Sequence, residues 1–314
     1  MALYMVTGGA GFIGSHMVEE LVRRGESVRI LDNLSTGREA NLAAVKGKID
    51  FRHADIRDLE SIRPILTGVD YVIHLAALGS VARSMENPVE TTLVNLNGTL
   101  NVLLAARDAR VKRVVLAATA AAYGDDPALP RVETQRPKPL SPYALTKLAG
   151  EYYGQIFHRN FGLEVVALRY FNIFGPRQNP RSPYTGVLSK FIVAYLRGTT
   201  PTIFGDGEQS RDFTYVANVV DATLRACLAP AAPGKVINVG TGRSSTLNQA
   251  IALLNSLFGV EVKPQYAPPR VGDMLHSTAD ISLARAILGY EPLVSFEDGL
   301  RRTVDSLRAA LAEA

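Results

Sequence analysis

Three residues of the chain, Thr119, Tyr143 and Lys147, carry a hydroxyl, a phenol and an ammonium group that suit proton transfer. Tyr143 and Lys147 are four positions apart, so a helix places them one turn apart on the same face. A tyrosine with a pKa of about 10 is a poor base at neutral pH unless a nearby cation stabilises its phenolate. Thr119 follows the strand-like run Arg113–Ala118, and its hydroxyl can share a proton with the tyrosine. We therefore predict an acid–base site.

A glycine-rich turn near the start of the chain is typical of dinucleotide binding. Gly8, Gly11 and Gly14 follow the strand-like run Leu3–Val6 and precede the amphipathic segment Ile13–Arg24. Glycines permit the tight turn and let the backbone approach a pyrophosphate, toward which the N-terminus of the following helix points. This pattern predicts a site for NAD or NADP.

Asp32 favours NAD over NADP. It ends the second strand-like run, Ser27–Leu31, where a carboxylate accepts hydrogen bonds from the adenosine ribose and repels a 2′-phosphate. Arg38 lies nearby in the sequence and leaves a role for NADP open. Asp55 follows the run Asp50–His53 and is a candidate for holding the adenine edge, or for capping a helix.

The alternation of short β-rich runs with helical patterns predicts a parallel sheet flanked by helices. We expect an α/β fold, a Rossmann-type doubly wound parallel sheet with a smaller α/β substrate-binding lobe. Residues 1–170 are expected to form the NAD-binding domain and residues 171–314 mainly the second lobe, with 216–242 returning to the first sheet. The further elements that we expect are Tyr71–Leu75, Thr91–Ala109, Tyr143–Arg159, Glu164–Arg169, Val216–Ala229 and Val236–Val239.

The composition excludes several classes of protein. With 47% hydrophobic and 20% charged residues over 314 positions, the chain has enough apolar side chains to form buried hydrophobic cores, which excludes a disordered protein. The net charge of +4, without a basic arm or acidic tail, argues against a nucleic-acid partner. We expect no membrane partner, targeting segment or metal site. The single cysteine, Cys227, predicts a buried thiol in a reducing, cytoplasmic setting.

Motifs along nearly the whole chain resemble the extended short-chain dehydrogenase/reductase superfamily, and within it the nucleotide-sugar epimerases. Their order and spacing make the resemblance specific. They are TGGAGFIGSH (7–16), LDNLSTG (31–37), DIRD (55–58), HLAA (74–77), NLNGT (95–99), AATAAAYGD (117–125), PLSPYALTK (139–147), LRYFNIFGPRQ (168–178), GDGEQSRDFTYV (205–216) and PRVGDMLHSTADISLARAILGY (269–290).

The resemblance implies that Thr119, Tyr143 and Lys147 are catalytic and that NAD is the cofactor. His74 is expected to be a structural histidine. The positions implied to contact the cofactor are Gly8, Gly11, Phe12, Ile13, Asp32, Asn33, Asp55, Ile56, Leu75, Ala76, Ala77, Asn95, Tyr143, Lys147 and Tyr170.

A UDP-sugar is the substrate that the resemblance implies, held by its diphosphate and uracil in the second lobe. Ser277 matches a position where a small residue leaves room for an N-acetyl group at C2 of the sugar, although Ser277 is also a candidate helix N-cap. The matching substrate positions are Ser80, Thr119, Asn172, Thr202, Phe204, Arg211, Arg270, Asp273 and Ser277.

The reaction that these features favour is epimerisation at C4 of the sugar. Dehydratases of the superfamily carry a carboxylate just after the catalytic Thr or Ser, whereas this chain has Ala120 and Ala121. A UDP-glucuronate 4-epimerase stays open, because Arg83, Arg177 and Arg181 are candidates for binding a carboxylate. A net reductase and a non-catalytic NAD-sensing protein on the same fold also stay open.

The resemblance also implies a homodimer. The helices near Thr91–Ala109 and Tyr143–Arg159 would pack against their counterparts in a second copy as a four-helix bundle.

Overall fold

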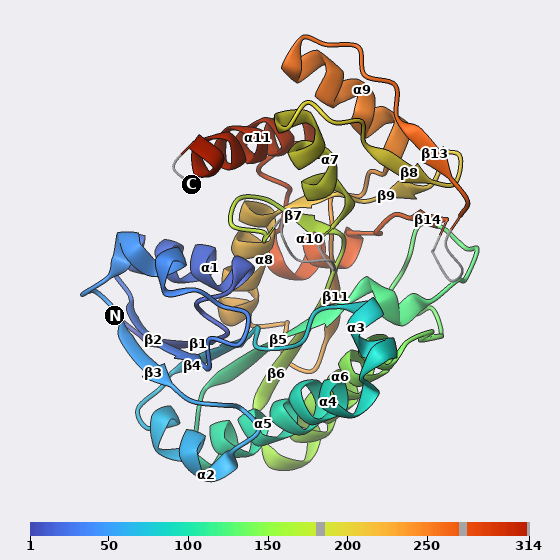
Figure 1. Ribbon diagram of the computed structural model, residues 1–314. Coiled ribbons are helices and arrows are strands. Elements are labelled where there is room, and N and C mark those ends of the chain that lie inside the picture. Colours follow the sequence, from blue (N-terminus) through green and yellow to red (C-terminus); the bar gives the residue numbers. More distant parts are fainter. Residues whose placement is uncertain (180–185, 270–274, 313–314) are drawn as a thin grey trace.

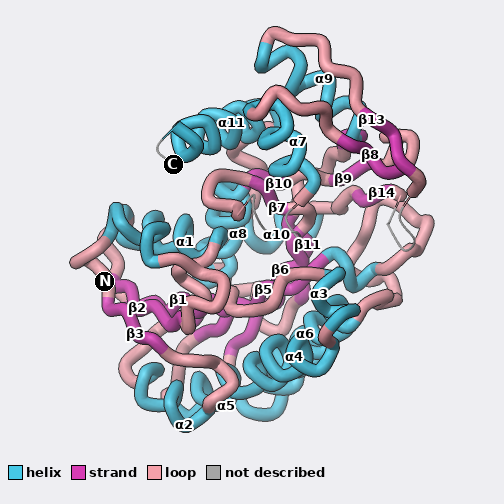
Figure 2. The backbone as a smooth tube through the Cα atoms, viewed as in Figure 1, coloured by secondary structure: helices cyan, strands magenta, loops and turns pink. Residues whose placement is uncertain are grey.

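A seven-stranded parallel sheet forms the centre of the molecule in the computed structural model, which describes residues 1–179, 186–269 and 275–312 (Figures 1 and 2). Its strand order is β11-β6-β5-β4-β1-β2-β3. Because the order reverses between β1 and β4, the sheet is doubly wound, and the predicted Rossmann-type fold class is confirmed. The strands are β1 (Leu3–Thr7), β2 (Ser27–Asp32), β3 (Asp50–His53), β4 (Tyr71–His74), β5 (Arg113–Thr119), β6 (Glu164–Tyr170) and β11 (Val236–Val239).

Helices cover both faces of this sheet because side chains alternate along each strand. In β1, Tyr4 and Val6 join the core shared with α1 and α8, whereas Met5 joins the core shared with α5 and α6. The helices of the first face are α1 (Phe12–Arg23), α8 (Val216–Leu228) and α10 (Ser282–Leu288). Those of the second face are α2 (Leu59–Ile62), α5 (Gly98–Asp108) and α6 (Pro142–Phe161). Short 3-10 turns are η1 (Glu39–Val45), η2 (Arg63–Leu66) and η4 (Ala120–Tyr123).

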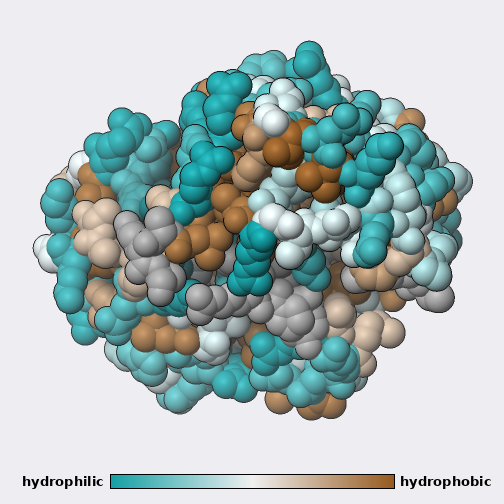
Figure 3. All heavy atoms as spheres, turned by 45° about the horizontal axis from the view of Figure 1, so that its top comes forward, coloured by the Kyte–Doolittle hydropathy of each residue, from teal (hydrophilic) through white to brown (hydrophobic). Residues whose placement is uncertain are grey.

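A second lobe lies beyond the carboxyl ends of the strands and has its own apolar core (Figure 1). The surface seen in Figure 3 is mixed, with small apolar patches separated by hydrophilic side chains. The helices of this lobe are α7 (Val187–Leu196), α9 (Leu247–Phe258) and α11 (Phe296–Ala312). Its strands pair as β7 (Ile173–Phe174) with β10 (Thr214–Tyr215), β8 (Thr202–Phe204) with β13 (Gln265–Ala267), and β9 (Ser210–Arg211) with β12 (Ser245–Thr246) and β14 (His276–Ser277).

The chain crosses between the two lobes more than once. After leaving the sheet at β6, it returns through α8 and through β11, which pairs with β6 in parallel. Ala284 and Leu288 of α10, much later in the sequence, are buried in the core on the same face as α8. No helix in the described ranges is long and apolar enough to cross a membrane.

The segment expected as a helix over Thr91–Ala109 is helical but contains a π-helical turn. Its first part is α4 (Pro88–Thr92), which follows α3 (Val81–Glu86), and a wider π-helical turn at Leu93–Asn97 separates α4 from α5. The turn contains Asn95, whose carboxamide bonds the backbone N–H and carbonyl of Leu78. The π-helical turn thus lies where Asn95 is hydrogen-bonded to Leu78. The sequence pattern of the helix does not indicate this contact.

Candidate active site

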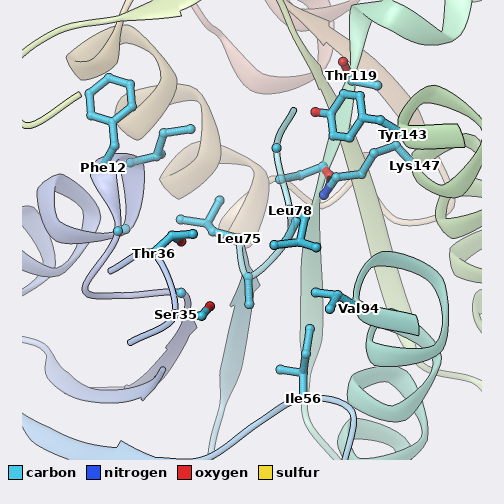
Figure 4. Close-up of a pocket in the computed structure, with 18 of the residues that line it drawn as sticks. Phe12, Ser35, Thr36, Ile56, Leu75, Leu78, Val94, Thr119, Tyr143 and Lys147 are labelled. Atoms are coloured by element: carbon cyan, nitrogen blue, oxygen red, sulfur yellow. Dashed lines mark hydrogen bonds between the residues drawn. The ribbon is translucent and has the colours of Figure 1, made fainter. Parts of the chain in front are cut away.

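A cleft of about 590 Å³ runs along the carboxyl ends of β1, β2, β4, β5 and β6, the edge at which open α/β sheets bind ligands (Figure 4). Most of the predicted cofactor positions line it. They are Gly8, Gly11, Phe12, Ile13, Asp32, Asn33, Asp55, Ile56, Leu75, Ala76, Ala77, Tyr143, Lys147 and Tyr170.

The glycine turn fits the close approach of a dinucleotide backbone. Gly8 has a φ of +70°, and a Cβ there would lie 2.8 Å from the backbone nitrogen of Ala76. A Cβ on Gly14 would overlap the carbonyl oxygen of Gly8. Gly11 is the N-cap of α1 and offers no side-chain cap, so the first N–H groups of this helix remain available to an anionic group in the cleft.

Asp32 is held by the backbone at the start of the cleft. Its Oδ2 accepts a 2.9 Å hydrogen bond from the N–H of Ala10, and its Oδ1 accepts a 2.8 Å bond from the N–H of Leu34. The carboxylate is therefore fixed at the cleft, where Ser35 and Thr36 also lie. Arg38, the residue that kept NADP open, is not among the lining residues.

Asp55 belongs to an ion pair rather than to a helix cap. Its Oδ2 accepts from the amide of Asn33 at 2.9 Å and from Arg57 at 2.6 Å, and the bond to Arg57 is the main cause of its lowered pKa. The helix that follows is capped by Asp58, so the alternative of Asp55 as an N-cap is wrong. Arg57 also lines the cleft, although it was not singled out from the sequence.

Thr119, Tyr143 and Lys147 come together in the cleft, as the sequence predicts (Figure 4). Ser141 caps α6 by accepting a 3.2 Å bond from the N–H of Ala144, which starts the helix just ahead of Tyr143. The Nζ atom of Lys147 donates a 2.9 Å bond to the carbonyl oxygen of Ala117 in β5.

Desolvation sets the acid–base properties of this cluster. It raises the pKa of Tyr143, and a side-chain hydrogen bond with Thr119 acts in the opposite direction. It also lowers the pKa of Lys147 to about 8. A phenol, a hydroxyl and an amine with a lowered pKa thus line one cleft. Together these groups can move a proton to or from a bound hydroxyl.

Three polar residues near the cleft have internal partners. His74 is 2% exposed and bonds the hydroxyls of Thr7 and Thr99, and burial lowers its pKa to about 3. A neutral, structural histidine is what the sequence favoured. Asn95 does not line the cleft and instead braces the loop at Leu78. Tyr170 lines the cleft, while its hydroxyl bonds Thr223 of α8 at 2.8 Å.

A second pocket of about 300 Å³ opens in the smaller lobe and contains Thr202, Phe204 and Arg211 of the predicted substrate set. Asn172 lines both this pocket and the first cleft. Arg211 donates to the carbonyl oxygen of Leu275 at 3.1 Å. Arg270, Asp273 and Arg181 lie outside the described residues.

Two of the predicted substrate residues do not reach the linings of the cleft or the second pocket. Ser80 caps α3, accepting from the N–H of Arg83. Ser277 is 2% exposed and lies in β14, in register with Arg211 of β9. The alternative that Ser277 caps the next helix is wrong, because the N-cap of α10 is Ile281.

The remaining arginines considered for a carboxylate substrate are already paired. Arg83 lines the cleft but forms a 3.0 Å ion pair with Glu90. Arg177 forms a 2.6 Å ion pair with Glu19 of α1. The sequence reasoning also missed Gln178, which lines both cavities. Its sequence signal is its place at the end of the motif LRYFNIFGPRQ (168–178), in the Gly- and Pro-rich stretch that follows β6.

The doubly wound sheet, the glycine turn and the cluster of Thr119, Tyr143 and Lys147 define a dinucleotide-dependent enzyme of the Rossmann-like α/β class. The sequence model of the NAD dependent epimerase/dehydratase family matches residues 4–240. The chain belongs to this family, and its cofactor is NAD.

Solved structures match the chain along nearly its full length. The UDP-glucose 4-epimerase of Thermotoga maritima, determined with UDP-glucose, is 41% identical with a TM-score of 0.94, over 98% of this chain and 99% of that one. The UDP-N-acetylglucosamine 4-epimerase of Methanobrevibacter ruminantium, determined with UDP-N-acetylmuramic acid, is 39% identical with a TM-score of 0.94 and the same coverage. The UDP-glucose 4-epimerase of Thermus thermophilus, determined with NAD, is 39% identical with a TM-score of 0.89 and the same coverage.

Proposed function

We propose that the protein catalyses NAD-dependent epimerisation at C4 of a UDP-hexose through a 4-keto intermediate. The proposed substrates are UDP-N-acetylglucosamine and UDP-N-acetylgalactosamine, with UDP-glucose and UDP-galactose also accepted. The observation that carries the proposal is the position of Thr119, Tyr143 and Lys147 in a cleft that shares Asn172 with a second pocket. Structural relatives named as 4-epimerases of UDP-glucose and of UDP-N-acetylglucosamine support it.

The cofactor end of the cleft is assigned to the glycine turn and to Asp32. The N–H groups at the start of α1 would hold the pyrophosphate, because the turn at Gly8 and Gly11 lacks side chains that block it. Asp32 would accept from the adenosine ribose and disfavour a 2′-phosphate. When bound, NAD supplies the hydride acceptor for C4 and afterwards the hydride donor.

The proton chemistry is assigned to Tyr143 and its two neighbours. As a phenolate, Tyr143 would remove the proton of the C4 hydroxyl while Thr119 shares a hydrogen bond with it. The ammonium group of Lys147, fixed on the carbonyl oxygen of Ala117, would stabilise the phenolate. The protonated tyrosine would then return its proton to the oxygen of the keto intermediate, which leaves the enzyme unchanged after each cycle.

Epimerisation rather than dehydration is proposed because loss of water needs an additional acid and base. Ala120 and Ala121 line the cleft directly after Thr119, where a dehydratase would place carboxylates. The second pocket, with Thr202, Phe204 and Arg211, is assigned to the uridine diphosphate. The basis for proposing that an N-acetyl group at C2 is accepted is the 39% identical relative named as a UDP-N-acetylglucosamine 4-epimerase. Ser277 is small and lies in register with Arg211, but it lines neither cavity.

The proposal is tested by incubating the purified protein separately with UDP-N-acetylglucosamine, UDP-glucose and UDP-glucuronate, without added NADH. Chromatography then resolves the two C4 epimers of each sugar. We expect conversion of the N-acetyl sugar to its galacto isomer, and slower conversion of UDP-glucose. Conversion of UDP-glucuronate alone would overturn the proposed specificity. No conversion of any of the three by protein that contains NAD would overturn the proposed activity.

We further propose a homodimer, for which an exposed apolar helix face is the support. Leu145, Tyr152 and Ile156 of α6 are 56%, 53% and 46% exposed, and Val89 of the adjoining α4 is 68% exposed. Helices α4 and α6 lie side by side at the lower right of Figure 1. Apolar side chains gathered on two neighbouring helices favour burial against another apolar surface, and the same pair of helices from a second copy would supply it.

A further inference from the structure

Gln178 occupies the place where the two cavities meet. It lines the first cleft together with Thr119 and Tyr143, and it lines the second pocket together with Thr202 and Arg211. If the uridine lies in the second pocket and the reacting sugar lies beside Tyr143, the diphosphate that joins them has to pass this junction. This step rests on the proposed function.

The direction of the Gln178 carboxamide is fixed by its two neighbours. The carbonyl oxygen of Ile173 can only accept a hydrogen bond, so the Nε2 atom must face it, at 3.4 Å. The Oε1 atom accepts a 2.7 Å bond from the hydroxyl of Ser189, a residue of α7 that is 1% exposed. The acceptor end is thus used inside the protein. Nε2 has a second N–H, for which no partner occurs among residues 1–179, 186–269 and 275–312.

The loop that carries Gln178 contacts α1 of the first lobe, in addition to the hydrogen bond of Gln178 with Ser189 of α7 in the second lobe. The Nε2 atom of His16 in α1 lies 3.0 Å from the carbonyl oxygen of Pro176, and Arg177 pairs with Glu19 of the same helix. Asn172 and Arg177 adopt φ angles of +27° and +67°, which non-glycine residues rarely do. Strained backbone of this kind persists where the surrounding contacts hold it, and it is common at ligand sites.

We propose that Gln178 is a substrate-binding residue whose second N–H donates a hydrogen bond to the diphosphate of the nucleotide sugar. The diphosphate is the part about which the 4-keto sugar turns before it is reduced on its other face. Arg211 supplies charge at one side of this turning point. Gln178 supplies a neutral, directional contact from a preset side chain, which fixes the position of the linkage and leaves the sugar free to turn.

Calorimetric titration of the NAD-loaded protein with UDP and with uridine tests this proposal. The main variant is Gln178→Glu, which keeps the size of the side chain but replaces the donor by a carboxylate that repels a diphosphate. A second variant, Gln178→Met, removes the donor without adding charge. The matched control is Gln249→Glu in α9, because Gln249 is exposed and its place in a capping box accepts Glu as well as Gln.

We expect Gln178→Glu to weaken UDP binding by roughly tenfold or more and Gln178→Met to weaken it by several fold, since hydrogen bonds to charged groups contribute more than neutral ones. Uridine binding should stay within about twofold of the parent protein in both variants. Equal losses for UDP and uridine would mean that the pocket has been disturbed, and unchanged UDP binding would mean that no contact exists. Either result overturns the proposal.

The outcome is separate from that of the proposed reaction, because the titrations do not depend on turnover. If the parent protein binds UDP but converts none of the UDP-sugars, the proposed activity fails while the effect of Gln178→Glu on UDP still decides the role of Gln178. If the parent protein is an active epimerase and the substitutions of Gln178 leave the affinity for UDP unchanged, the proposed role of Gln178 is wrong while the proposed activity stands.

Discussion

The Nζ atom of Lys147 lies 2.9 Å from the carbonyl oxygen of Ala117, two residues before Thr119 at the end of β5. One hydrogen bond therefore ties the helix that carries Tyr143 to the strand that carries Thr119. Lys147 is 8% exposed, and this contact places its amine inside the cleft rather than in solvent. The helix and the strand are thereby held in the relative position that brings the phenol and the hydroxyl together.

The buried ammonium group of Lys147 should make the cofactor-free protein less stable. Burial lowers the pKa of Lys147 from 10.5 to about 8, which corresponds to a cost of about 3 kcal/mol in the free energy of unfolding when the amine is charged. A variant without the amine avoids this cost but loses the hydrogen bond to Ala117, which contributes about 1 kcal/mol. We expect Lys147→Met to raise the free energy of unfolding by about 2 kcal/mol at pH 7, measured by urea denaturation, while activity is lost.

The pH dependence of this gain follows from the sign of the pKa change. The folded protein binds the Lys147 proton less tightly than the unfolded chain, so between about pH 8 and pH 10.5 the unfolded state holds more protons and the stability of the parent protein rises with pH. The advantage of Lys147→Met should therefore shrink across this range. A constant advantage, or a loss of stability at pH 7, would contradict the assignment of a desolvated ammonium.

Replacing Tyr143 should affect chemistry more than binding. Tyr143→Phe removes the phenol that the account uses as base, and we expect kcat to fall by about 10²- to 10⁴-fold while NAD content is retained. Chromatographic turnover assays and the absorbance of bound cofactor measure the two quantities. Tyr152→Phe, on the same helix but outside the cleft, is the control and should keep normal kcat, because it also keeps the aromatic ring on the proposed dimer face. Near-normal turnover of Tyr143→Phe would remove the phenol from the mechanism.

Two glycines of α6 offer a matched pair for stability. A Cβ on Gly150 would meet only the Cγ2 atom of Thr99, at 3.6 Å, whereas a Cβ on Gly154 would lie 2.8 Å from Cγ1 of Val165. Calorimetry should find Gly150→Ala more stable by about 0.5–1 kcal/mol, because alanine favours the helix. Gly154→Ala should be less stable by about 1–3 kcal/mol because of overpacking. Equal changes in the free energy of unfolding for the two variants would contradict the close contact of Gly154 with Val165 of β6.

The proposed homodimer makes a prediction about mass in solution. Placing glutamates at Tyr152 and Ile156 would bury charge in the interface, so we expect the double variant to sediment as a monomer in analytical ultracentrifugation. Leu293→Glu is the control, since Leu293 is 63% exposed and lies outside α4 and α6. A parent protein that sediments as a monomer would refute the dimer directly.

Features encoded within a few residues were predictable from the sequence. The spacing of Tyr143 and Lys147 fixes their common helix face, and the junction of Leu3–Thr7 with the glycines fixes the turn at the cofactor end. The parallel sheet followed from the alternation of strand and helix patterns. In these cases the local chemistry and the global fold favour the same arrangement.

Features that depend on distant contacts were not predictable. The bonds of Asn95 with Leu78 accompany the π-helical turn inside the expected helix, and nothing in the helical pattern of the segment indicates this partner. Ser277 lies buried in a short strand because His276–Ser277 pairs with β9, far away in sequence. Gln178 gains its place between the two cavities from Ser189 of α7 and from the anchoring of its loop on α1.

The central claim is that the hydrogen at C4 leaves and returns as hydride within the cleft. It is tested most directly by running the reaction with UDP-N-acetylglucosamine in D₂O and determining the isotope at C4 of the galacto product by NMR and mass spectrometry. We expect ordinary hydrogen at C4, because a hydride held by the bound cofactor does not exchange with solvent. Deuterium at C4 would mean that the hydrogen is lost as a proton, and would contradict the account.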